Sequence, residues 1–565
     1  MKTNLKLVDD HFHDYDVDDV PLDEPSDGFT ALGFHRNAAV VFSDLQKCVV
    51  HLRPRDLSEV NLRMQLGTEW FDACSAFLES KDKQGGRRGS STAMVGTYIL
   101  ASCQAAGKFR PSAERGAGTW LDEDGGLIVN GDALWRHDGT VLQHGIRGDY
   151  VYPDAASLGY GPDTALATQD DVDRLLTVFR SYNWSVPAGA EMVLGWIGSS
   201  LLATALRRRP HMLVTGSHGS GKSTLLEQVS RLLGKNAAQV TGRPTLIGLN
   251  QLVKEHPSRV IVIDEFEGEG QGIRRSDVFE AARASYSLQE GDSGVVRGSV
   301  TGDAISYRLS SPFLAGGISP AHLEPADQSR WVVLELKKLE KPSEAKSNLP
   351  SREELDALGP RLARLLVSRW PAFRQNLEVF RGAVLEVGGD HRMADTYSPL
   401  LAGFWTFKQE DVASGEEALE LVERAQVRAR VDSLEVRDEQ ECLNALLTRV
   451  VTFPGGLGGS SKLSIGEACN QVAEDAPGKR QTEGRLAQLG LRVRLSKADG
   501  KWYLLVANSL NHSELRRLFA GTKWAHGNWS VVLRRLPGGH ESTQRLGPGM
   551  PPAKVTAFQL PQQAD

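Results

Sequence analysis

Apolar residues between positions 211 and 336 alternate between short continuous runs and stretches with the spacing of a helix. Residues 260–263 are four consecutive β-branched residues, as expected for a strand that is buried on both faces of a parallel sheet. The apolar residues after position 224 recur at helical spacing until Gly234, which is placed to end a helix. We therefore predict an α/β domain whose strands lie at 212–214, 238–241, 260–263, 312–317 and 331–336.

The chain before this domain has two different patterns. Residues 1–27 carry many aspartates and few large apolar residues, which predicts a disordered acidic leader. Residues 28–165 combine short apolar runs and a helical stretch with Asp-Gly and Asn-Gly dipeptides, which are typical of β-hairpin turns. We predict a small α+β domain there, and we expect the α/β domain itself to span residues 166–345.

The chain after the α/β domain is also divided in two. Ser351 and Glu354 have the spacing of a capping box, which predicts that a helical lid region occupies residues 346–447. Within residues 448–565 the pattern changes to a helix at 481–490, two strands around a turn, and a further helix. That order of elements favours a winged-helix-like domain.

Composition narrows the class of protein. The chain has 565 residues, 40% hydrophobic and 24% charged, with a net charge of −6, which is ordinary for a globular protein of several domains. Its five cysteines are scattered and suggest neither a disulfide framework nor a zinc site. The longest apolar run, 192–206, is too short for a membrane span and predicts a buried helix. We expect a cytoplasmic protein without membrane contact.

The first predicted strand leads into a glycine-rich loop with the pattern G-x-x-x-x-G-K-[ST]. Glycines let backbone N–H groups approach phosphate oxygens, and the following helix N-terminus adds positive potential. Lys222 is expected to reach the β- and γ-phosphates, and the hydroxyl of Ser223 to bind Mg²⁺. The predicted nucleoside triphosphate site consists of Gly216, Ser217, His218, Gly219, Ser220, Gly221, Lys222, Ser223 and Thr224.

Two carboxylates, Asp264 and Glu265, follow the most apolar strand about forty residues after this loop. Burying charged groups costs free energy, so two carboxylates at the end of a buried strand indicate a functional role. We expect Asp264 to hold Mg²⁺ and Glu265 to orient and polarise the attacking water.

Two further features fit an ATPase that acts on nucleic acid. Residues 295–310 predict a hairpin with Arg297 on one arm and Arg308 on the other, which either contacts DNA or simply covers a sheet edge. Arg330 begins the last strand and either reaches a neighbouring subunit's γ-phosphate as a catalytic residue or pairs with Asp327.

The C-terminal segment is basic. From residue 479 onward it contains fourteen lysines and arginines against five acidic residues, with three tryptophans and a tyrosine interleaved. Basic residues neutralise phosphates and exposed aromatic rings stack on bases, whereas the alternative buries the tryptophans in a small core. The candidate DNA contacts in this segment are Arg516, Arg517, Lys523, Arg534 and Arg535.

Residues 190–336 resemble the P-loop helicase core of phage- and prophage-encoded replication proteins, near the superfamily 3 branch of the AAA+ ATPases. The resemblance rests on GSHGSGKST at 216–224, VIVIDEFE at 260–267, residues 293–313 and ADQSRWVVLEL at 326–336. Residues 116–126 and 515–538 also look like flanking regions of such proteins. Two features depart from the family: Gly316 and Gly317 stand where a polar sensor is expected, and residues 301–303 contain no lysine.

The resemblance implies an AAA+-like core that uses ATP and Mg²⁺ and assembles as a homo-oligomer, expected to be a hexameric ring. Such a ring would translocate on single-stranded or forked DNA and unwind duplex DNA in a bacterial host, with a separate primase as a partner. Arg297 matches the family's pre-sensor hairpin and Arg330 its trans-acting arginine finger.

Two other classes of function remain to be compared with a helicase. One is an AAA+ DNA-binding switch (an initiator, loader or defence ATPase) that uses ATP to assemble without processive unwinding. The other is a small-molecule kinase, which would need neither the Asp264–Glu265 pair nor the basic C-terminal segment.

Overall fold

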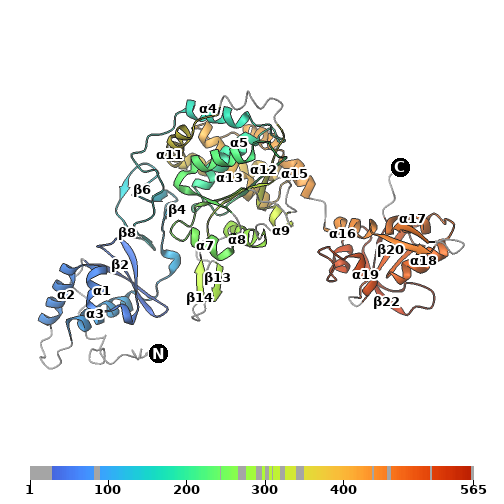
Figure 1. The fold of residues 1–565 in the computed structure, drawn as a ribbon, viewed down its shortest axis with the longest axis horizontal. Coiled ribbons are helices and arrows are strands. Elements are labelled where there is room, and N and C mark those ends of the chain that lie inside the picture. The colour runs from blue at the N-terminus through green and yellow to red at the C-terminus, as the bar shows by residue number, and fades with distance from the viewer. Residues whose placement is uncertain are drawn as a thin grey trace. The chain divides into compact units, whose positions relative to one another are not determined.

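The computed structural model describes residues 28–81, 90–241, 244–264, 275–287, 295–298, 304–307, 309–317, 323, 325–338, 349–434, 438–454, 460–509 and 512–560. The chain folds into two compact units, Met1–Ala429 and Arg430–Asp565. Figure 1 shows both, and each is described separately below.

The first unit begins with a small α+β region, as predicted. Its strands β1 (Phe29–His35), β2 (Ala38–Ser43) and β3 (Cys48–Leu52) form an antiparallel sheet. Three helices pack on this sheet around a shared apolar core: α1 (Glu59–Leu66), α2 (Thr68–Lys81) and α3 (Ser91–Ala106).

A second antiparallel sheet follows, with β4 (Gly118–Leu121), β5 (Leu127–Asn130), β6 (Leu134–Arg136) and β7 (Val141–Leu142) in sequential order. The connections between these strands contain the Asp-Gly and Asn-Gly dipeptides at 124–125, 130–131 and 138–139, so the hairpin turns predicted there are confirmed. A short pair, β8 (Gly145–Arg147) and β9 (Tyr150–Tyr152), ends this part of the chain.

The centre of the first unit is a five-stranded sheet whose strands are all parallel. Its spatial order is β11-β12-β15-β10-β16, so the chain leaves β10, builds three strands on one side and returns to place β16 on the other. The five predicted strands are therefore confirmed, with bounds β10 (His211–Gly216), β11 (Ala237–Val240), β12 (Val260–Ile263), β15 (Phe313–Gly317) and β16 (Trp331–Leu336).

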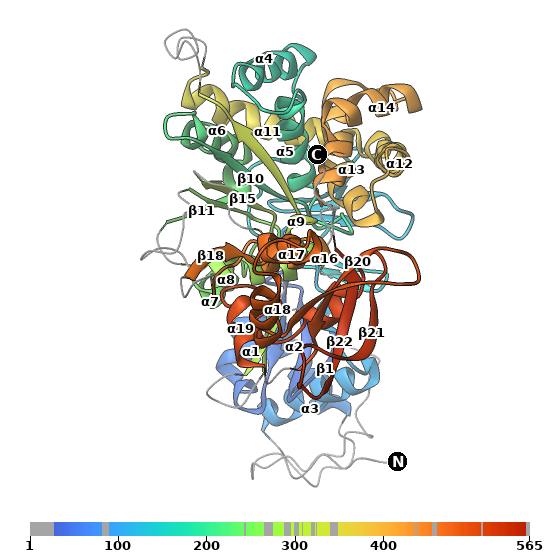
Figure 2. The same ribbon diagram turned by 90° about the vertical axis from the view of Figure 1, so that its right-hand side faces the viewer.

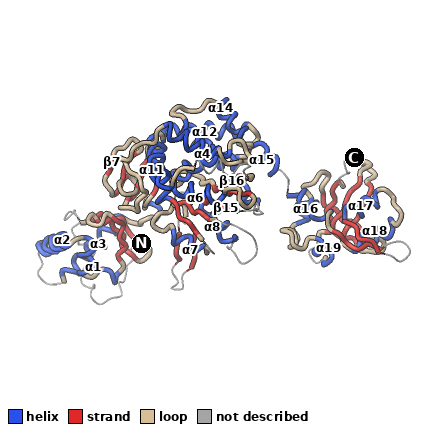
Figure 3. The backbone as a smooth tube through the Cα atoms, turned by 45° about the horizontal axis from the view of Figure 1, so that its top comes forward, coloured by secondary structure: helices blue, strands red, loops and turns tan. Residues whose placement is uncertain are grey.

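Helices cover both faces of this sheet (Figures 1 and 3). On one side lie helices that include α6 (Lys222–Leu233), α4 (Gln169–Arg180), α5 (Gly189–Leu201), α11 (Arg352–Ser368), α12 (Trp370–Glu386), α13 (His391–Lys408) and α14 (Gly415–Arg424). On the other side, α7 (Leu246–Leu252) and α8 (Arg275–Ser287) share an apolar core with the sheet.

The long apolar run at 192–206 is explained by helix α5, which is buried along its whole length. It crosses α13 so closely that a Cβ at Gly195 would lie 1.8 Å from the carbonyl oxygen of Leu400, and one at Gly403 would lie 2.5 Å from that of Gly195. In the same way, Gly359 brings α11 against the carbonyl oxygen of Leu232 in α6. The predicted lid helices are thus packed into the body of the first unit.

A hairpin is inserted between β12 and β15, as predicted. Its strands are β13 (Val295–Gly298) and β14 (Ala304–Tyr307), and they pair antiparallel from Val295↔Tyr307 to Gly298↔Ala304. The short helix α9 (Pro325–Gln328) precedes β16. Helix α15 (Val427–Leu434) includes the position in the sequence at which the first unit ends and the second begins.

The C-terminal unit (Figure 2) begins earlier than the predicted boundary after residue 447. Helix α16 (Asp438–Leu447) buries Cys442, Leu443 and Leu446 in the core of this unit, so the boundary lies after Ala429. The rest of the unit comprises β17 (Val450–Pro454), β18 (Ser460–Ser464), α17 (Ile465–Ala473), α18 (Lys479–Gln488), β19 (Leu491–Leu495), β20 (Trp502–Ala507), α19 (Ser513–Leu518), α20 (Trp529–Leu533), β21 (His540–Arg545) and β22 (Pro552–Gln559).

The predicted order helix, strand, turn, strand, helix corresponds to α18, β19, β20 and α19. The pattern analysis did not include β21 and β22, which complete an antiparallel sheet of order β19-β20-β22-β21. All five cysteines are free thiols. Among the helices in the described part of the chain, none is both long and apolar enough to cross a membrane.

Candidate nucleotide-binding site

The glycine-rich loop joins the carboxyl end of β10 to the first turn of α6. Its glycines adopt backbone conformations that other residues rarely take, with φ of 151° at Gly216 and 96° at Gly221. A Cβ at Gly216 would lie 2.2 Å from the carbonyl oxygen of Leu336, and one at Gly221 would lie 3.1 Å from Cε1 of Tyr182. Both glycines are therefore required by the fold of the loop.

The ammonium group of Lys222 lies over this loop. Its Nζ donates hydrogen bonds to the carbonyl oxygens of Gly216, at 2.7 Å, and Ser217, at 3.0 Å. The side chains of Ser223 and Thr224 are exposed at the start of α6, where unpaired backbone N–H groups and the helix dipole favour an anion. The loop thus holds a positive charge and two exposed hydroxyls beside a helix N-terminus.

One loop residue is buried. Ser220 is fully buried, and its Oγ has no hydrogen-bond partner within the described residues. Ser217, His218 and Gly219 are exposed at the tip. The nine residues predicted to form the phosphate site therefore occupy one continuous loop and the first turn of one helix.

Tyr182 supports the loop from behind, and the sequence analysis missed it. Its hydroxyl donates to Oε1 of Gln228 in α6 at 3.0 Å, and burial raises the pKa of the phenol well above its usual value, so it stays a neutral donor. The segment around it is fixed to the end of β16, because the Ser185 N–H donates to the Glu335 carbonyl oxygen at 2.9 Å. This pairing joins residues 150 positions apart (335 minus 185), so no local pattern indicates it.

Asp264 lies at the same edge of the sheet as the phosphate loop. It follows β12 directly, and β15 alone separates β12 from β10. A Cβ built on Gly316, at the end of β15, would lie 3.2 Å from Oδ1 of Asp264 and 2.9 Å from Cδ2 of Leu226. The carboxylate of Asp264 therefore lies close to the side of α6, one turn beyond Ser223.

This arrangement fits a magnesium ion bound to a triphosphate. Carboxylate and hydroxyl oxygens are the ligands that Mg²⁺ takes from proteins beside phosphates. Asp264 and Ser223 are both exposed at the edge of the sheet where ligands of open α/β sheets bind. The geometry also explains why Gly316 replaces the polar residue expected from the resemblance, since a side chain there would collide with Leu226 and crowd Asp264.

Three of the predicted functional side chains lie outside the described residues. These are Glu265, Arg308 and the side chain of Arg297, whose backbone pairs with Ile305 in the β13–β14 hairpin. Their predicted roles remain predictions.

Arg330 lies at the opposite edge of the sheet from the phosphate loop. Its carbonyl oxygen accepts from the N–H of His211, the first residue of β10, whereas the loop follows the last residue of β10. Its guanidinium lies 5.7 Å from the ring centroid of Tyr286, and partial burial lowers its pKa. Arg330 therefore lies a whole strand length away from the phosphate loop of its own chain.

Asp327 was the alternative partner for Arg330. Both of its carboxylate oxygens bind the guanidinium of Arg283, in two hydrogen bonds of 2.6 Å. Asp327 is fully buried, so this bidentate pair anchors the start of β16 to α8.

The predicted DNA contacts of the C-terminal unit are largely ion-paired. Arg517 pairs with Glu514 at 2.7 Å and Arg534 pairs with Glu541 at 3.1 Å. Lys523 lies between Asp438, at 2.7 Å, and Glu441, at 3.0 Å. Arg516 and Arg535 are exposed, and no ion pair is found for either within the described part of the chain.

Two of the three tryptophans of this unit, Trp524 and Trp529, lie in its core, which was the alternative to base stacking, whereas Trp502 is only partly buried against it. Trp529 is fully buried, its ring stacks on Phe519 with centroids 5.2 Å apart, and its Nε1 donates to the carbonyl oxygen of Ala507. Trp524 is also buried. Neither ring is available to a nucleic-acid base.

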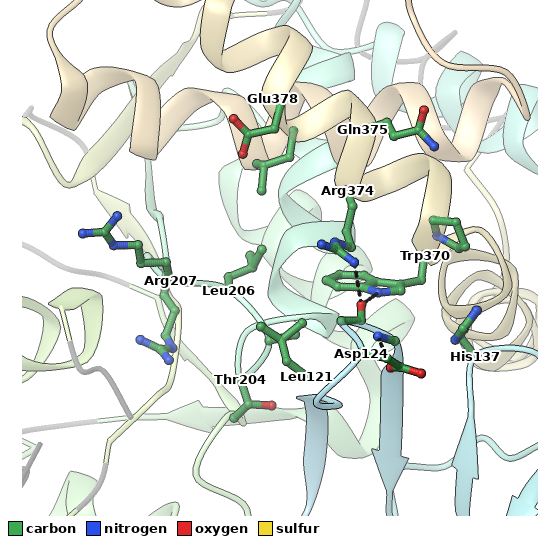
Figure 4. A pocket seen from close by; sticks show the side chains of 16 residues that line it. Leu121, Asp124, His137, Thr204, Leu206, Arg207, Trp370, Arg374, Gln375 and Glu378 are labelled. Carbon is green, nitrogen blue, oxygen red and sulfur yellow. Dashed lines mark hydrogen bonds between the residues drawn. The ribbon is translucent and has the colours of Figure 1, made fainter. Parts of the chain in front are cut away.

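The first unit also contains an open cavity of about 1030 Å³ that lies away from the phosphate loop (Figure 4). It is bounded by the β4–β5 turn, residues 204–209 and the start of α12. Trp370 Nε1 and Arg374 Nη1 both donate to the carbonyl oxygen of Gly125 and so fasten the turn to the helix. The cavity is lined by three arginines and by the acidic residues Asp124 and Glu378, among others. No residue of the predicted nucleotide site lines it.

Comparison of the chain with models of known protein families and with curated proteins finds no match.

Proposed function

We propose that the chain binds MgATP at residues 216–224 and hydrolyses it. The observation that carries this proposal is the meeting of Asp264, Gly316 and Leu226, which puts an acidic side chain and the phosphate-loop helix at one edge of the parallel sheet. A carboxylate beside a glycine-rich loop and a helix N-terminus is the arrangement needed to hold a metal-bound triphosphate.

Each residue has a distinct role in the proposed reaction. The loop N–H groups and Lys222 bind the phosphates, and Lys222 neutralises charge that develops on the γ-phosphoryl group. Ser223 and Asp264 would hold the Mg²⁺ ion, whose charge would neutralise the phosphate oxygens. Glu265 accepts a hydrogen bond from the attacking water and orients it toward the γ-phosphorus.

We propose further that hydrolysis drives movement on DNA, so that the chain acts as an ATP-dependent helicase in the replication of a phage or mobile element. The β13–β14 hairpin supports this proposal. It is inserted in the chain between β12, which Asp264 follows, and β15, which pairs with β10, and it protrudes from the first unit (Figure 1). It therefore connects the proposed site to an element that could contact DNA. The position of Arg330 is compatible with a ring of subunits, since it lies a strand length from the phosphate loop of its own chain and its proposed partner is the γ-phosphate of a neighbouring subunit.

Strand displacement tests this function. With ATP and Mg²⁺ the full-length chain is expected to separate a forked DNA duplex that carries a single-stranded arm, and to release nothing without ATP. ATP hydrolysis that is stimulated by single-stranded DNA without displacement would contradict a helicase and favour the ATP-dependent switch.

A further inference from the structure

Helices α17 and α18 of the C-terminal unit pack against each other and are joined by a short turn, as the two helices of a helix-turn-helix are. Helix α17 ends at Ala473 and α18 begins at Lys479, with Gly478 at φ 88° making the turn between them. Both helices share a core with α16, and the β19–β20 hairpin follows α18 directly. In DNA-binding proteins with this arrangement, the second helix enters the major groove.

The outer face of α18 is polar and exposed. Thr482, Leu486 and Ala487 face the core of the unit. The opposite face, which has the spacing of one side of a helix, consists of Arg480, Gln481, Gly484 and Gln488, all exposed. Arg485, at the rim, donates to Oε1 of Gln488 at 3.0 Å. This face has no large apolar side chain, so it lacks the apolar centre that a stable protein–protein interface usually contains.

Gly484 lies in the middle of this exposed face. Glycine destabilises the interior of a helix relative to alanine, so it needs a reason. The packing of the unit supplies none, because a Cβ at Gly484 would meet no atom within 4 Å. Its backbone is not among the positive-φ glycines either. A glycine at this exposed position leaves the helix backbone open to close approach by a ligand.

The charge of this region fits a polyanion. Residues 479–501 contain seven lysines and arginines and two acidic residues. The two acids are Asp499, which accepts a hydrogen bond from the hydroxyl of Tyr503, and Glu483, which is exposed on α18. Lys497 and Lys501 are exposed at the tip of the β19–β20 hairpin, which lies at the end of β19 opposite to the connection with α18.

We propose that α18 reads base pairs in the major groove of duplex DNA, while the tip of the β19–β20 hairpin contacts the phosphate backbone. Arg480 and Gln481 have the side chains that pair bidentately with guanine and adenine, respectively. Duplex RNA is a poorer fit, because its major groove is too narrow to admit a helix. Single strands are bound mainly by exposed aromatic rings, whereas Trp524 and Trp529 are buried, and Trp502 and Tyr503 pack partly buried against the core of the unit.

This inference deepens the proposed action on DNA by naming a sequence-specific duplex site, and it does not require ATP hydrolysis. The test is selection of duplexes from a random-sequence library by the full-length chain without nucleotide. We expect enrichment of one short sequence, and we expect Lys222→Ala to enrich the same sequence. Absence of enrichment, or preference for a single strand of equal length, would overturn the inference but leave the ATPase proposal standing.

Substitutions separate binding from folding. Gly484→Glu adds a helix-favouring residue where nothing obstructs it, so the melting temperature should hold or rise, yet its carboxylate should weaken binding to the enriched duplex by at least about 10-fold. The double variant Arg480→Ala/Gln481→Ala should also weaken binding to the enriched duplex by at least about 10-fold. Selection with this variant should tolerate more bases at the positions that these two side chains contact. Unchanged affinity in both variants would contradict the proposed reading face.

Lys554→Ala provides the matched control. Lys554 is exposed on β22, next to the residue that pairs with Ala507, so it lies at the end of β20 farthest from the hairpin tip. Its loss removes one positive charge from the same unit and should leave the enriched sequence unchanged. If Lys554→Ala weakens binding as much as the α18 variants do, the affinity reflects net charge alone and the inference fails.

Discussion

Replacing Lys222 with alanine is expected to lower the rate of ATP hydrolysis at least about 100-fold, because removal of one group that stabilises transition-state charge typically has an effect of that size. The ammonium lies within 3.0 Å of two loop carbonyl oxygens, where it can also reach phosphate oxygens bound by the loop. Phosphate release measured at saturating ATP and Mg²⁺ tests this expectation.

Lys235→Ala is the control for this variant. Lys235 follows the other end of α6, and its Nζ donates to the hydroxyl of Ser157 rather than to the phosphate loop. Its loss should leave hydrolysis within about two-fold of the unaltered rate, as surface substitutions usually do. Equal rates in the unaltered chain and Lys222→Ala would mean that nucleotide is hydrolysed elsewhere.

Glu265→Gln is expected to trap ATP. The amide keeps the shape of the side chain but cannot polarise water as a carboxylate does, so hydrolysis should fall about 10² to 10⁴-fold while ATP still binds. ATP that stays bound should stabilise the proposed oligomer. Size-exclusion chromatography with light scattering, run with ATP and Mg²⁺, measures the molar mass of this oligomer.

The control for Glu265→Gln is Glu255→Gln, which makes the same chemical change at an exposed residue before the opposite end of β12. It should hydrolyse ATP like the unaltered chain. Hydrolysis at the normal rate by Glu265→Gln would show that another group orients the water, and the assignment of Glu265 would be wrong.

Local signals in the sequence were sufficient for the central sheet. The β-branched run at 260–263 and the glycine loop before a helical pattern are each determined by neighbouring residues, and the structure contains both strands and the helix where they were predicted. The turn dipeptides likewise predicted the hairpins between β4 and β7. The parallel arrangement also follows from the continuous apolar character of these strands.

Features that depend on distant residues were not predictable in this way. Tyr182 supports the phosphate loop only because its segment pairs with the end of β16. The acidic partners of Lys523 come from α16, more than seventy residues earlier, so the lysine looked available in the sequence. Gly316 looked like a missing sensor until Leu226 and Asp264 were found beside it.

The boundary of the C-terminal unit has a similar explanation. Helix α16 continues the helical pattern of the preceding region, so the sequence analysis assigned it to the lid. Its apolar face instead packs against α17 and α20, and α20 lies more than eighty residues further along the chain. Periodicity shows that a helix has an apolar face, and only the tertiary fold shows what covers it.

A cryo-electron microscopy map of the full-length chain with Mg²⁺ and a non-hydrolysable ATP analogue would test the central claim most directly. We predict density for the triphosphate along residues 216–224 and for a metal ion between Ser223 and Asp264. A triphosphate bound anywhere else, or a metal ion held without Asp264, would contradict the proposed site.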